Sequence, residues 1–315
     1  MKTIVIVVYA GAQLLDITGP ASVFAEASGI AGNASYQVSL VSSEGGVVKT
    51  HGGLGLETRP FSDMTHEAID TLILPGAHEP SVRALLQDEG MAAWVRVTAD
   101  RADRLASICS GAFALAAWGL LDGRRATTHW EAAAELKHRF PAISVEEQAL
   151  FVEDGKVWTS AGVSTGIDMT LALVEHDLGR EVATKVARRM VLQMRRPGHQ
   201  SQFSSLLDAQ GGEYATLVSW IGDHLSSDLS AEALAERAGQ APRTFHRRFK
   251  AQTGVTPANF VERLRLDRAR ALIEAGVAPT RVVASAGFGS LDQMGRAFRR
   301  AFGLSPSAYR TLHKI

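Results

Sequence analysis

The hydrophobic positions of residues 1–190 follow two periods in turn. Short runs of β-branched and aliphatic residues, typical of buried strands, alternate with stretches in which apolar residues recur every three or four positions, as on one face of a helix. This alternation predicts an α/β sandwich, in which helices cover a mostly parallel sheet. The predicted strands are Thr3–Val8, Tyr36–Ser42, Ala68–Leu74, Arg104–Ile108 and an Ala149–Thr159 hairpin, and the predicted helices are Pro20–Ala27, Glu79–Leu86, Gly90–Asp100, Gly111–Trp118, Ile167–Gly179 and Glu181–Met194.

In the last hundred or so residues the apolar period is helical throughout, and one arrangement occurs twice. Leu229–Gly239 and Pro279–Gly287 each predict a short helix that ends at a glycine, the residue that best closes a helix. A tight turn follows, and a helix with a basic face then begins at Pro242 and at Leu291, respectively. Helix, glycine turn and basic helix form the helix-turn-helix pattern of DNA-binding proteins. Pro257–Ala275 predicts one long helix between the two motifs.

The two basic helices carry candidate DNA-contacting residues opposite an apolar side, because residues three and four apart share one side of a helix. A basic helix face is the shape that enters the major groove. The predicted apolar sides contain Phe245 and Phe249 in the first helix, Met294, Ala297, Phe298 and Ala301 in the second, and Phe260, Leu264, Ala271 and Leu272 in the long helix. The predicted DNA-facing residues are Arg243, His246, Arg247 and Lys250 in the first helix and Asp292, Arg296 and Arg299 in the second.

Charge and cysteine content support this division. From Tyr214 onward there are 15 Lys and Arg against 8 Asp and Glu, a net charge of +7, and the preceding residues carry −7. A basic half is the electrostatic footprint of a nucleic-acid-binding domain. The single cysteine excludes an internal disulfide framework and fits the cytoplasm. No apolar run approaches the roughly 18 residues of a membrane span. Neither a metal-ligand spacing among the ten histidines nor a phosphate-binding loop is present, so no cofactor is expected.

Residues 229–310 resemble the tandem helix-turn-helix domain of the AraC family of transcription regulators. The strongest match is Gly287-Phe288, then Phe298–Pro306 and Tyr309-Arg310. The resemblance implies an operator in double-stranded DNA as partner, with RNA polymerase as a further candidate. It assigns Arg243, His246 and Arg247 to the first groove, and Leu291, Asp292, Gly295 and Arg296 to the second. Family members often carry polar residues in place of Leu291 and Gly295, so we expect the first motif to dominate sequence reading.

Three side chains of the α/β region are candidates for a site at the carboxyl ends of the strands, where such sheets bind ligands. Cys109 lies between a predicted strand and helix, an elbow at which the helix N-terminus should favour the thiolate. His129 could pair with that thiol, and Asp16 is placed in the loop after the first strand. Alternatively, Cys109 is a small buried apolar residue, His129 a satisfied core histidine and Asp16 a turn cap. The backbone amides suggested to form an anion or oxyanion pocket are those of Gly76, Ala77 and Ser110.

Residues 3–190 resemble the PfpI-like branch of the class I glutamine amidotransferase-like, flavodoxin-like fold. The matching motifs are Leu15-Asp16 with Gly19-Pro20, Leu74–Gly76, Ile108–Phe113, Gly119–Trp130 and Thr159–Gly162. Enzymes of this branch, such as isocyanide hydratases and glyoxalase-like or deglycase-like proteins, use a cysteine at the elbow and an acid that matches Asp16. Ser110 and Ala77 depart mildly from the enzymes, which often have Thr and Gly there. Fusion to a tandem helix-turn-helix domain implies that the old active site now senses a small effector.

These observations favour a cytoplasmic one-component transcription regulator. Residues 1–194 would form the sensor domain, 195–212 the linker and 213–315 the DNA-binding domain, with a homodimer formed through residues 1–194. The alternative is a PfpI-like cysteine-dependent enzyme of hydratase, glyoxalase or amidase type with an accessory DNA-binding domain. A third hypothesis keeps the regulator but replaces ligand binding by oxidation of Cys109.

Overall fold

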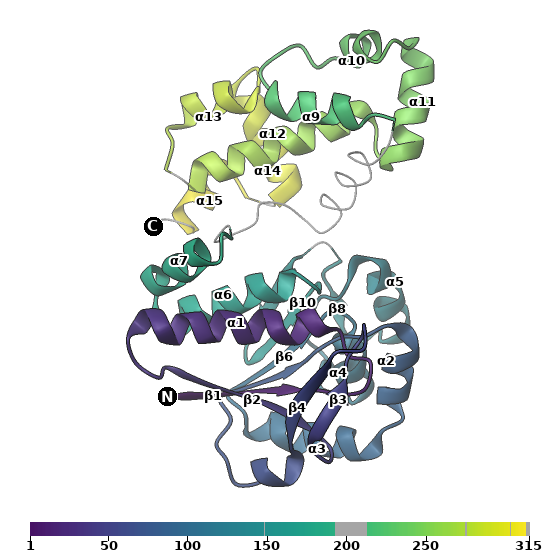
Figure 1. Cartoon of the computed structure of the whole chain (residues 1–315). Coiled ribbons are helices and arrows are strands. Elements are labelled where there is room, and N and C mark those ends of the chain that lie inside the picture. Colours follow the sequence, from purple (N-terminus) through teal and green to yellow (C-terminus); the bar gives the residue numbers. More distant parts are fainter. Residues whose placement is uncertain (148, 193–212, 275, 303, 313–315) are drawn as a thin grey trace. The chain divides into compact units, whose positions relative to one another are not determined.

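The computed structural model describes residues 1–192 except 148, and residues 213–312 except 275 and 303 (Figure 1). By its internal contacts the chain divides into two compact units, Met1–Arg196 and Pro197–Ile315, here called the N-terminal and C-terminal units. The predicted linker 195–212 lies outside the described residues, as does Met194 at the end of the last helix predicted before it.

One sheet of eight described strands forms the centre of the N-terminal unit. Its order is β3-β4-β2-β1-β5-β6-β10-β9, and the neighbours from β4 to β10 pair in parallel while β3 and β9 pair antiparallel at the edges. The bounds are β1 Lys2–Val7, β2 Tyr36–Ser42, β3 Gly46–Lys49, β4 Gly55–Pro60, β5 Thr71–Leu74, β6 Arg104–Ile108, β9 Phe151–Asp154 and β10 Val157–Ser160. The predicted mostly parallel sheet is therefore confirmed.

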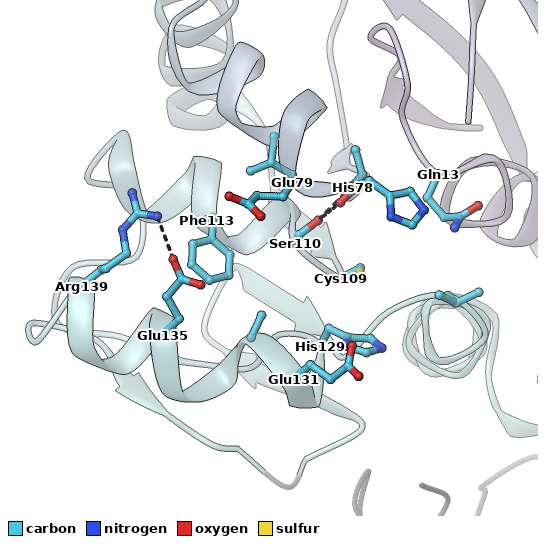
Figure 2. A pocket seen from close by; sticks show the side chains of 14 residues that line it. Gln13, His78, Glu79, Cys109, Ser110, Phe113, His129, Glu131, Glu135 and Arg139 are labelled. Atoms are coloured by element: carbon cyan, nitrogen blue, oxygen red, sulfur yellow. Dashed lines mark hydrogen bonds and ion pairs between the residues drawn. The ribbon is translucent and has the colours of Figure 1, made fainter. Parts of the chain in front are cut away.

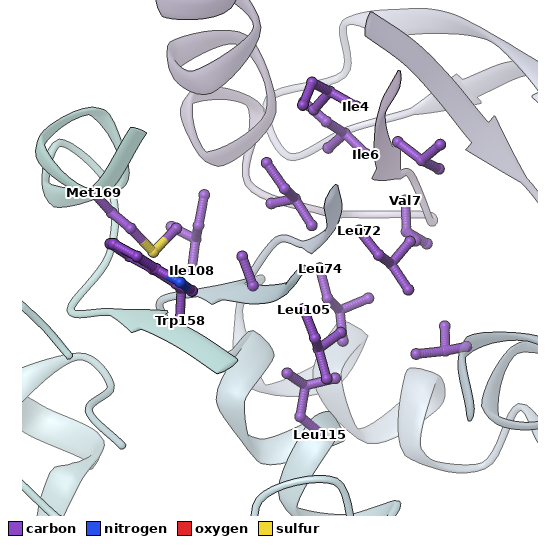
Figure 3. Packing of buried hydrophobic residues seen from close by; sticks show 14 of the residues in the cluster. Ile4, Ile6, Val7, Leu72, Leu74, Leu105, Ile108, Leu115, Trp158 and Met169 are labelled. Atoms are coloured by element: carbon purple, nitrogen blue, oxygen red, sulfur yellow. The ribbon is translucent and has the colours of Figure 1, made fainter. Parts of the chain in front are cut away.

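The central strands are runs of valine, isoleucine and leucine because helices bury both faces of the sheet. Residues such as Ile4, Leu72 and Leu74 are completely buried, and Leu115 and Met169 from covering helices add to the core (Figure 3). On one face α1 (Leu14–Ala31), α6 (Thr165–Leu178) and α7 (Arg180–Arg189) pack on one another, and α2 (Glu79–Leu86), α3 (Glu89–Arg101) and α4 (Gly111–Ala117) lie on the other (Figure 1).

The first helix begins at Leu14 rather than at Pro20, where the sequence placed its start. Pro20 lies inside α1, although a proline in a helix interior removes a backbone hydrogen bond and costs about 3 kcal/mol or more. The buried side of α1, which includes Ile17 and Phe24, packs on the core and offsets that loss. Asp16 is consequently in the first turn of α1, not in the preceding loop.

Several elements of the N-terminal unit that the sequence did not predict are short or exposed. Strand β3 is almost entirely solvent-exposed, so it has no alternating apolar pattern. The pair β7 (Arg125–Ala126) and β8 (Ser144–Val145) spans two residues in each strand, and η1 (Phe61–Met64) is one 3-10 turn. Helix α5 (Trp130–Arg139) buries only Ala133 and Leu136, too few residues to form a recognisable stripe.

The described part of the C-terminal unit is all-α, as predicted, and has two small cores. Phe245, Phe249 and Tyr214 are central to the first core, and Met294 and Phe298 to the second. The helices are α9 Ala215–Asp223, α10 Ala231–Arg237, α11 Pro242–Thr253, α12 Pro257–Glu274, α13 Pro279–Ala286, α14 Leu291–Phe302 and α15 Pro306–Leu312. Helices α10 and α11 form the first helix-turn-helix motif, and α13 and α14 form the second. Within the described residues, no helix combines the length and apolar composition needed to cross a bilayer.

Two details of the predicted apolar sides are wrong. Ala301 is exposed, and Phe302 packs in its place against Phe298, with ring centroids 4.4 Å apart. Helix α12 contributes to both cores, so its buried side shifts along its length and no single stripe describes it. Phe260 is buried as predicted and Leu264 and Leu272 are half-buried, whereas the fully packed positions further along are Leu266, Ala269 and Ile273.

Candidate functional site

A cavity of about 480 Å³ opens at the carboxyl ends of β5 and β6 (Figure 2). Four of the six residues predicted for this site line the cavity, and Asp16 and Gly76 lie in the layer behind it. The lining residues are Gln13, Ala77, His78, Glu79, Val82, Cys109, Ser110, Phe113, His129, Glu131, Ala132, Glu135, Arg139 and Val163.

Cys109 occupies the predicted strand-to-helix elbow. It directly follows β6, its φ of 54° is in the left-handed region, and α4 begins two residues later. Such a conformation costs a non-glycine residue about 1–3 kcal/mol, so the surroundings must hold it. The amide of Cys109 donates to the Ser160 carbonyl at 2.9 Å. A Cβ at Gly162 would lie 2.7 Å from Sγ, and one at Gly76 would lie 2.8 Å from the Cys109 Cβ, so both glycines are required by close packing.

Asp16 is completely buried beside this elbow. Its Oδ2 accepts a hydrogen bond of 2.9 Å from the Gly76 amide, and the backbone of Val163 also stabilises the carboxylate, although no described residue meets hydrogen-bond geometry at Oδ1. Burial raises the pKa of Asp16 to about 6, because desolvation of the carboxylate outweighs the backbone hydrogen bonds that stabilise it. Asp16 therefore does more than cap a turn, because its hydrogen bond to Gly76 ties α1 to the loop after β5.

The thiol of Cys109 does not have the lowered pKa that its elbow position suggested. Burial raises the pKa of Cys109 to about 12, and the neighbouring Asp16 carboxylate adds to the rise. Hydrogen bonds from Ser110 act in the opposite direction but are smaller. Desolvation disfavours any charged form, and here it outweighs the short α4 helix. The thiol is consequently protonated throughout the physiological pH range.

His129 lines the cavity with Cys109 but is not its hydrogen-bond partner among the described residues. It precedes α5 as the N-cap, and its Nδ1 lies 3.7 Å from a carboxylate oxygen of Glu131. The contact to the elbow comes instead from Thr128, whose hydroxyl donates to the Cys109 carbonyl at 2.8 Å. The expected thiol–imidazole pair is therefore absent within the described part of the chain.

Two of the three amides suggested for an anion pocket are already engaged. The Gly76 amide donates to Asp16, and the Ala77 amide donates to the Ser110 hydroxyl at 2.9 Å. That hydroxyl in turn donates to the Ala77 carbonyl at 2.7 Å, which joins the loops after β5 and β6. The suggested three-amide oxyanion pocket is thus wrong for Gly76 and Ala77, because neighbouring side chains saturate these donors.

The cavity also brings together charged residues that sequence reasoning missed. Glu131, Glu135 and Arg139 recur at four-residue spacing along α5, a pattern that would have been visible had this helix been predicted. Arg139 lies 3.2 Å from Glu135, and its guanidinium carbon is 5.8 Å from the centre of the Phe113 ring (Figure 2). A ligand in this cavity meets aromatic surface, one arginine and several carboxylates.

The first recognition helix, α11, has the two sides that its sequence predicted. Phe245 and Phe249 are completely buried, with ring centroids 5.3 Å apart. Pro242 stands in the first turn of the helix, and Ser230 caps the preceding helix α10 by accepting from the Ala233 amide. The side chains exposed on the opposite side are Arg243, His246, Arg247 and Lys250.

The second recognition helix, α14, is built similarly. Met294, Ala297 and Phe298 are buried, while Ser290 caps the helix by accepting from the Gln293 amide at 3.1 Å. Arg300 is 2.8 Å from Glu262 of α12, so its charge is already paired. Leu291, Asp292, Arg296 and Arg299 are exposed, and Gly295 is half-buried.

An α/β domain with a cysteine elbow, followed by two helix-turn-helix motifs with basic outer sides, defines a class of DNA-binding regulator. Residues 2–176 match the DJ-1/PfpI family, and residues 234–311 match a helix-turn-helix domain family. The chain is 33% identical over 281 residues to the HTH-type transcriptional regulator CdhR of Pseudomonas aeruginosa, an alignment that covers 88% of this chain and 82% of that protein.

Two further relatives match the N-terminal unit. Isonitrile hydratase of Pseudomonas putida is 34% identical over 177 residues, which are 55% of this chain and 71% of that enzyme. The crystal structure of a THiJ/PfpI family protein from Pseudomonas syringae is similar with a TM-score of 0.53 and 28% identity, over 60% of this chain and 74% of that one. The chain belongs to the DJ-1/PfpI family in its N-terminal part and is a transcription regulator with an AraC-type DNA-binding domain. Both resemblances seen in the sequence are confirmed.

Proposed function

We propose that this regulator senses a small-molecule effector in the cavity beside Cys109 and transmits its binding to the DNA-binding domain. In this proposal residues 1–194 are the sensor, residues 195–212 the linker and residues 213–315 the DNA-binding domain. The observation that carries the proposal is the state of the cavity. It has the volume of a small-molecule site, yet its only thiol, that of the half-buried Cys109, has a raised pKa and is protonated near neutral pH.

The same features argue against a working cysteine nucleophile. The thiolate is the reactive form of cysteine, and a thiol with a pKa of about 12 forms almost none of it near neutral pH. The amides of Gly76 and Ala77 are bonded to side chains and are not available to an oxyanion. A cavity of this kind can bind a ligand without transforming it. The pKa of Cys109 also argues against oxidation as the main signal, because oxidation follows thiolate character.

For the DNA-binding domain, we propose that Arg243, His246 and Arg247 of α11 read bases in one major-groove segment and that α14 contacts the next segment. Lys250 of α11 contacts a phosphate in this proposal. The proposal extends to a homodimer formed through residues 1–194 and to RNA polymerase as a further partner. Sedimentation at micromolar concentration tests the dimer: a monomer that still binds its operator fully would contradict it.

The effector proposal is tested by footprinting the full chain on DNA upstream of its own gene, with and without panels of small metabolites. We expect at least one compound to change both the footprint and the thermal midpoint of the N-terminal unit. Substitution of the lining residue Glu135 by Gln should weaken the compound's effect, while Glu181→Gln on the exposed surface of α7 should not. A compound that acts equally on both variants would place the effector elsewhere.

A cysteine-dependent enzyme remains the second candidate, because two observations favour it. The left-handed Cys109 beside a completely buried acid with a raised pKa is an arrangement suited to catalysis. A relative of the N-terminal unit is also an isonitrile hydratase. The test is turnover of isonitriles and glyoxals by the purified chain. Rates on the order of 1 s⁻¹ or faster, lost in Cys109→Ala and in Asp16→Asn, would make the enzyme the better assignment.

A further inference from the structure

One large aliphatic side chain is exposed at the start of the second recognition helix. Leu291 is the first residue of α14, and 48% of its surface is exposed. No other large aliphatic or aromatic side chain is this exposed among the described residues of the C-terminal unit. A single exposed leucine is ordinary on a protein surface. Leu291, however, shares the first two turns of α14 with the exposed Asp292 and Arg296, so it meets whatever this end of the helix binds.

Gly295 follows Leu291 by one helical turn and leaves the helix without a side chain there. Nothing outside the local helix backbone lies within 4 Å of the position that a Cβ on Gly295 would take. Helices α11 and α14 each have 12 residues, and the fifth residue is His246 in α11 and Gly295 in α14. An imidazole therefore projects from this place in the first motif, whereas a base pair can approach the backbone in the second.

The surface beside Leu291 is recessed and partly apolar. Leu291 and Gly295 line a hollow of about 270 Å³, and its lining also includes Ile273, Val277 and Met294. A methyl group that enters such a surface is removed from water at a gain in free energy. A hydroxyl or amide group placed against the same apolar atoms would lose hydrogen bonds to water. The surface therefore favours an apolar group of the DNA.

We propose that Leu291 contacts the C5-methyl group of a thymine in the second major-groove segment. This methyl group is the apolar feature that base pairs present in the major groove, and apolar side chains recognise it. The N-terminal residues of a recognition helix contact base edges, and Leu291 is the first residue of α14. The contact requires that α14 enter the groove, as proposed above. It discriminates less than an arginine bonded to guanine, in agreement with the expectation that the first motif dominates sequence reading.

The test is a scan in which thymines are replaced by uracil, which lacks only the C5-methyl group. The full-length wild-type chain first selects a high-affinity duplex from a random library, and each thymine of this duplex is then replaced singly. Fluorescence anisotropy with the labelled duplexes measures affinity. We expect a thymine about 10 base pairs from the bases whose preference changes in Arg247→Ala. Uracil at this position should weaken wild-type binding about fourfold, the effect of one methyl group that is no longer buried.

Three variants assign this effect to Leu291. Leu291→Ala should bind the thymine and the uracil duplex equally, because the methyl group then has no partner. Leu291→Met keeps an apolar side chain of similar size and should retain the difference. The matched control is Leu54→Ala, which truncates a 60% exposed leucine of the N-terminal unit and should behave as the wild type. Far-UV circular dichroism and the thermal midpoint show whether each variant is folded.

Two outcomes would overturn the methyl contact: a uracil effect that persists unchanged in Leu291→Ala, or a wild-type chain that binds every uracil duplex as tightly as the parent duplex. Library selection with Arg296→Ala separates this failure from failure of the groove proposal. An unchanged base preference in Arg296→Ala would show that α14 does not read the second segment, and the methyl contact would fall with it. A changed preference in Arg296→Ala without any uracil effect would overturn the methyl contact alone.

Discussion

Gly287 packs directly on the carbonyl group of Leu225, so that a Cβ on this glycine would lie 1.7 Å from the Leu225 oxygen. Gly287 ends α13 of the second helix-turn-helix motif with a φ of 76°, and Leu225 lies between α9 and α10, beside the first motif. Arg265 of the joining helix α12 donates from Nε to the same oxygen at 3.1 Å. These contacts join the end of α13 and helix α12 to the segment that precedes the first motif.

Gly287→Ala should therefore lower the free energy of unfolding of the C-terminal unit by more than the cost of a left-handed alanine alone. A left-handed alanine costs about 1–2 kcal/mol, and the collision with Leu225 adds a further penalty of roughly 1–3 kcal/mol. Gly254→Ala is the matched control, because Gly254 has a φ of 73° and open space around its Cβ position. Hydrogen exchange resolved by peptide should show faster opening of α10 and α13 in Gly287→Ala than in Gly254→Ala. Equal effects of the two substitutions would mean that the contact does not couple the motifs.

Much of this organisation could be predicted from the sequence, for physical reasons that differ between regions. The exposed side of α11 followed from helix periodicity alone, and the elbow at Cys109 followed from the order of strand and helix. The raised pKa of Cys109 could not be foreseen, because it depends on burial and on Asp16, more than ninety residues away. Periodicity reports local geometry, whereas desolvation depends on residues that only the folded chain brings together.

The ionisation of Cys109 gives a second prediction. A pKa of about 12 means that alkylation of this thiol should accelerate steadily from pH 7 to pH 10, with no plateau. Cys109 is the only cysteine, so the measured rate belongs to it and Cys109→Ala serves as the blank. Rates followed by mass spectrometry with iodoacetamide provide the measurement. A plateau near pH 7 would show a thiolate stabilised by α4 and would revive the enzyme and redox hypotheses.

Cys109→Ala should also separate effector sensing from DNA binding. The side chain lines the cavity of the N-terminal unit, whereas the described DNA-facing residues belong to the C-terminal unit. We expect the variant to lose the effector-dependent change in footprint while its affinity for the operator stays within about twofold of the wild type. Footprinting measures the first and fluorescence anisotropy with labelled operator the second. An intact effector response in Cys109→Ala would remove this residue from the proposed sensing site.

Asp16 should make the N-terminal unit less stable as the pH rises. Its pKa is about 6 in the folded chain and close to 4 when unfolded, so the folded state holds the proton more tightly. The contribution of the protonated carboxyl is complete below pH 4 and is lost between pH 4 and pH 6. The difference corresponds to about 3 kcal/mol.

Asp16→Asn removes this titration, so the free energy of unfolding of the variant should rise relative to the wild type between pH 4 and pH 6 and then stay constant. Urea unfolding at several pH values measures it, and Asp100→Asn on the exposed surface of α3 is the control. A constant difference between Asp16→Asn and the wild type across this range would contradict the raised pKa.

The last prediction separates two adjacent arginines of the first recognition helix. Arg247 is on the exposed side opposite Phe245 and Phe249, whereas Arg248 lies 3.6 Å from Glu213 and is directed to a different side of the helix. If α11 enters the major groove, Arg247→Ala should cost about 1–3 kcal/mol and relax specificity at one or two base pairs. Arg248→Ala should leave the base preference unchanged.

Lys250→Ala should weaken binding to all sequences alike and reduce the salt slope by about one, as expected for a phosphate contact. Duplexes selected from a random library by each variant, followed by competition binding at several salt concentrations, distinguish these outcomes. An Arg247→Ala protein that selects the same sites with wild-type affinity would show that this side of α11 does not read DNA.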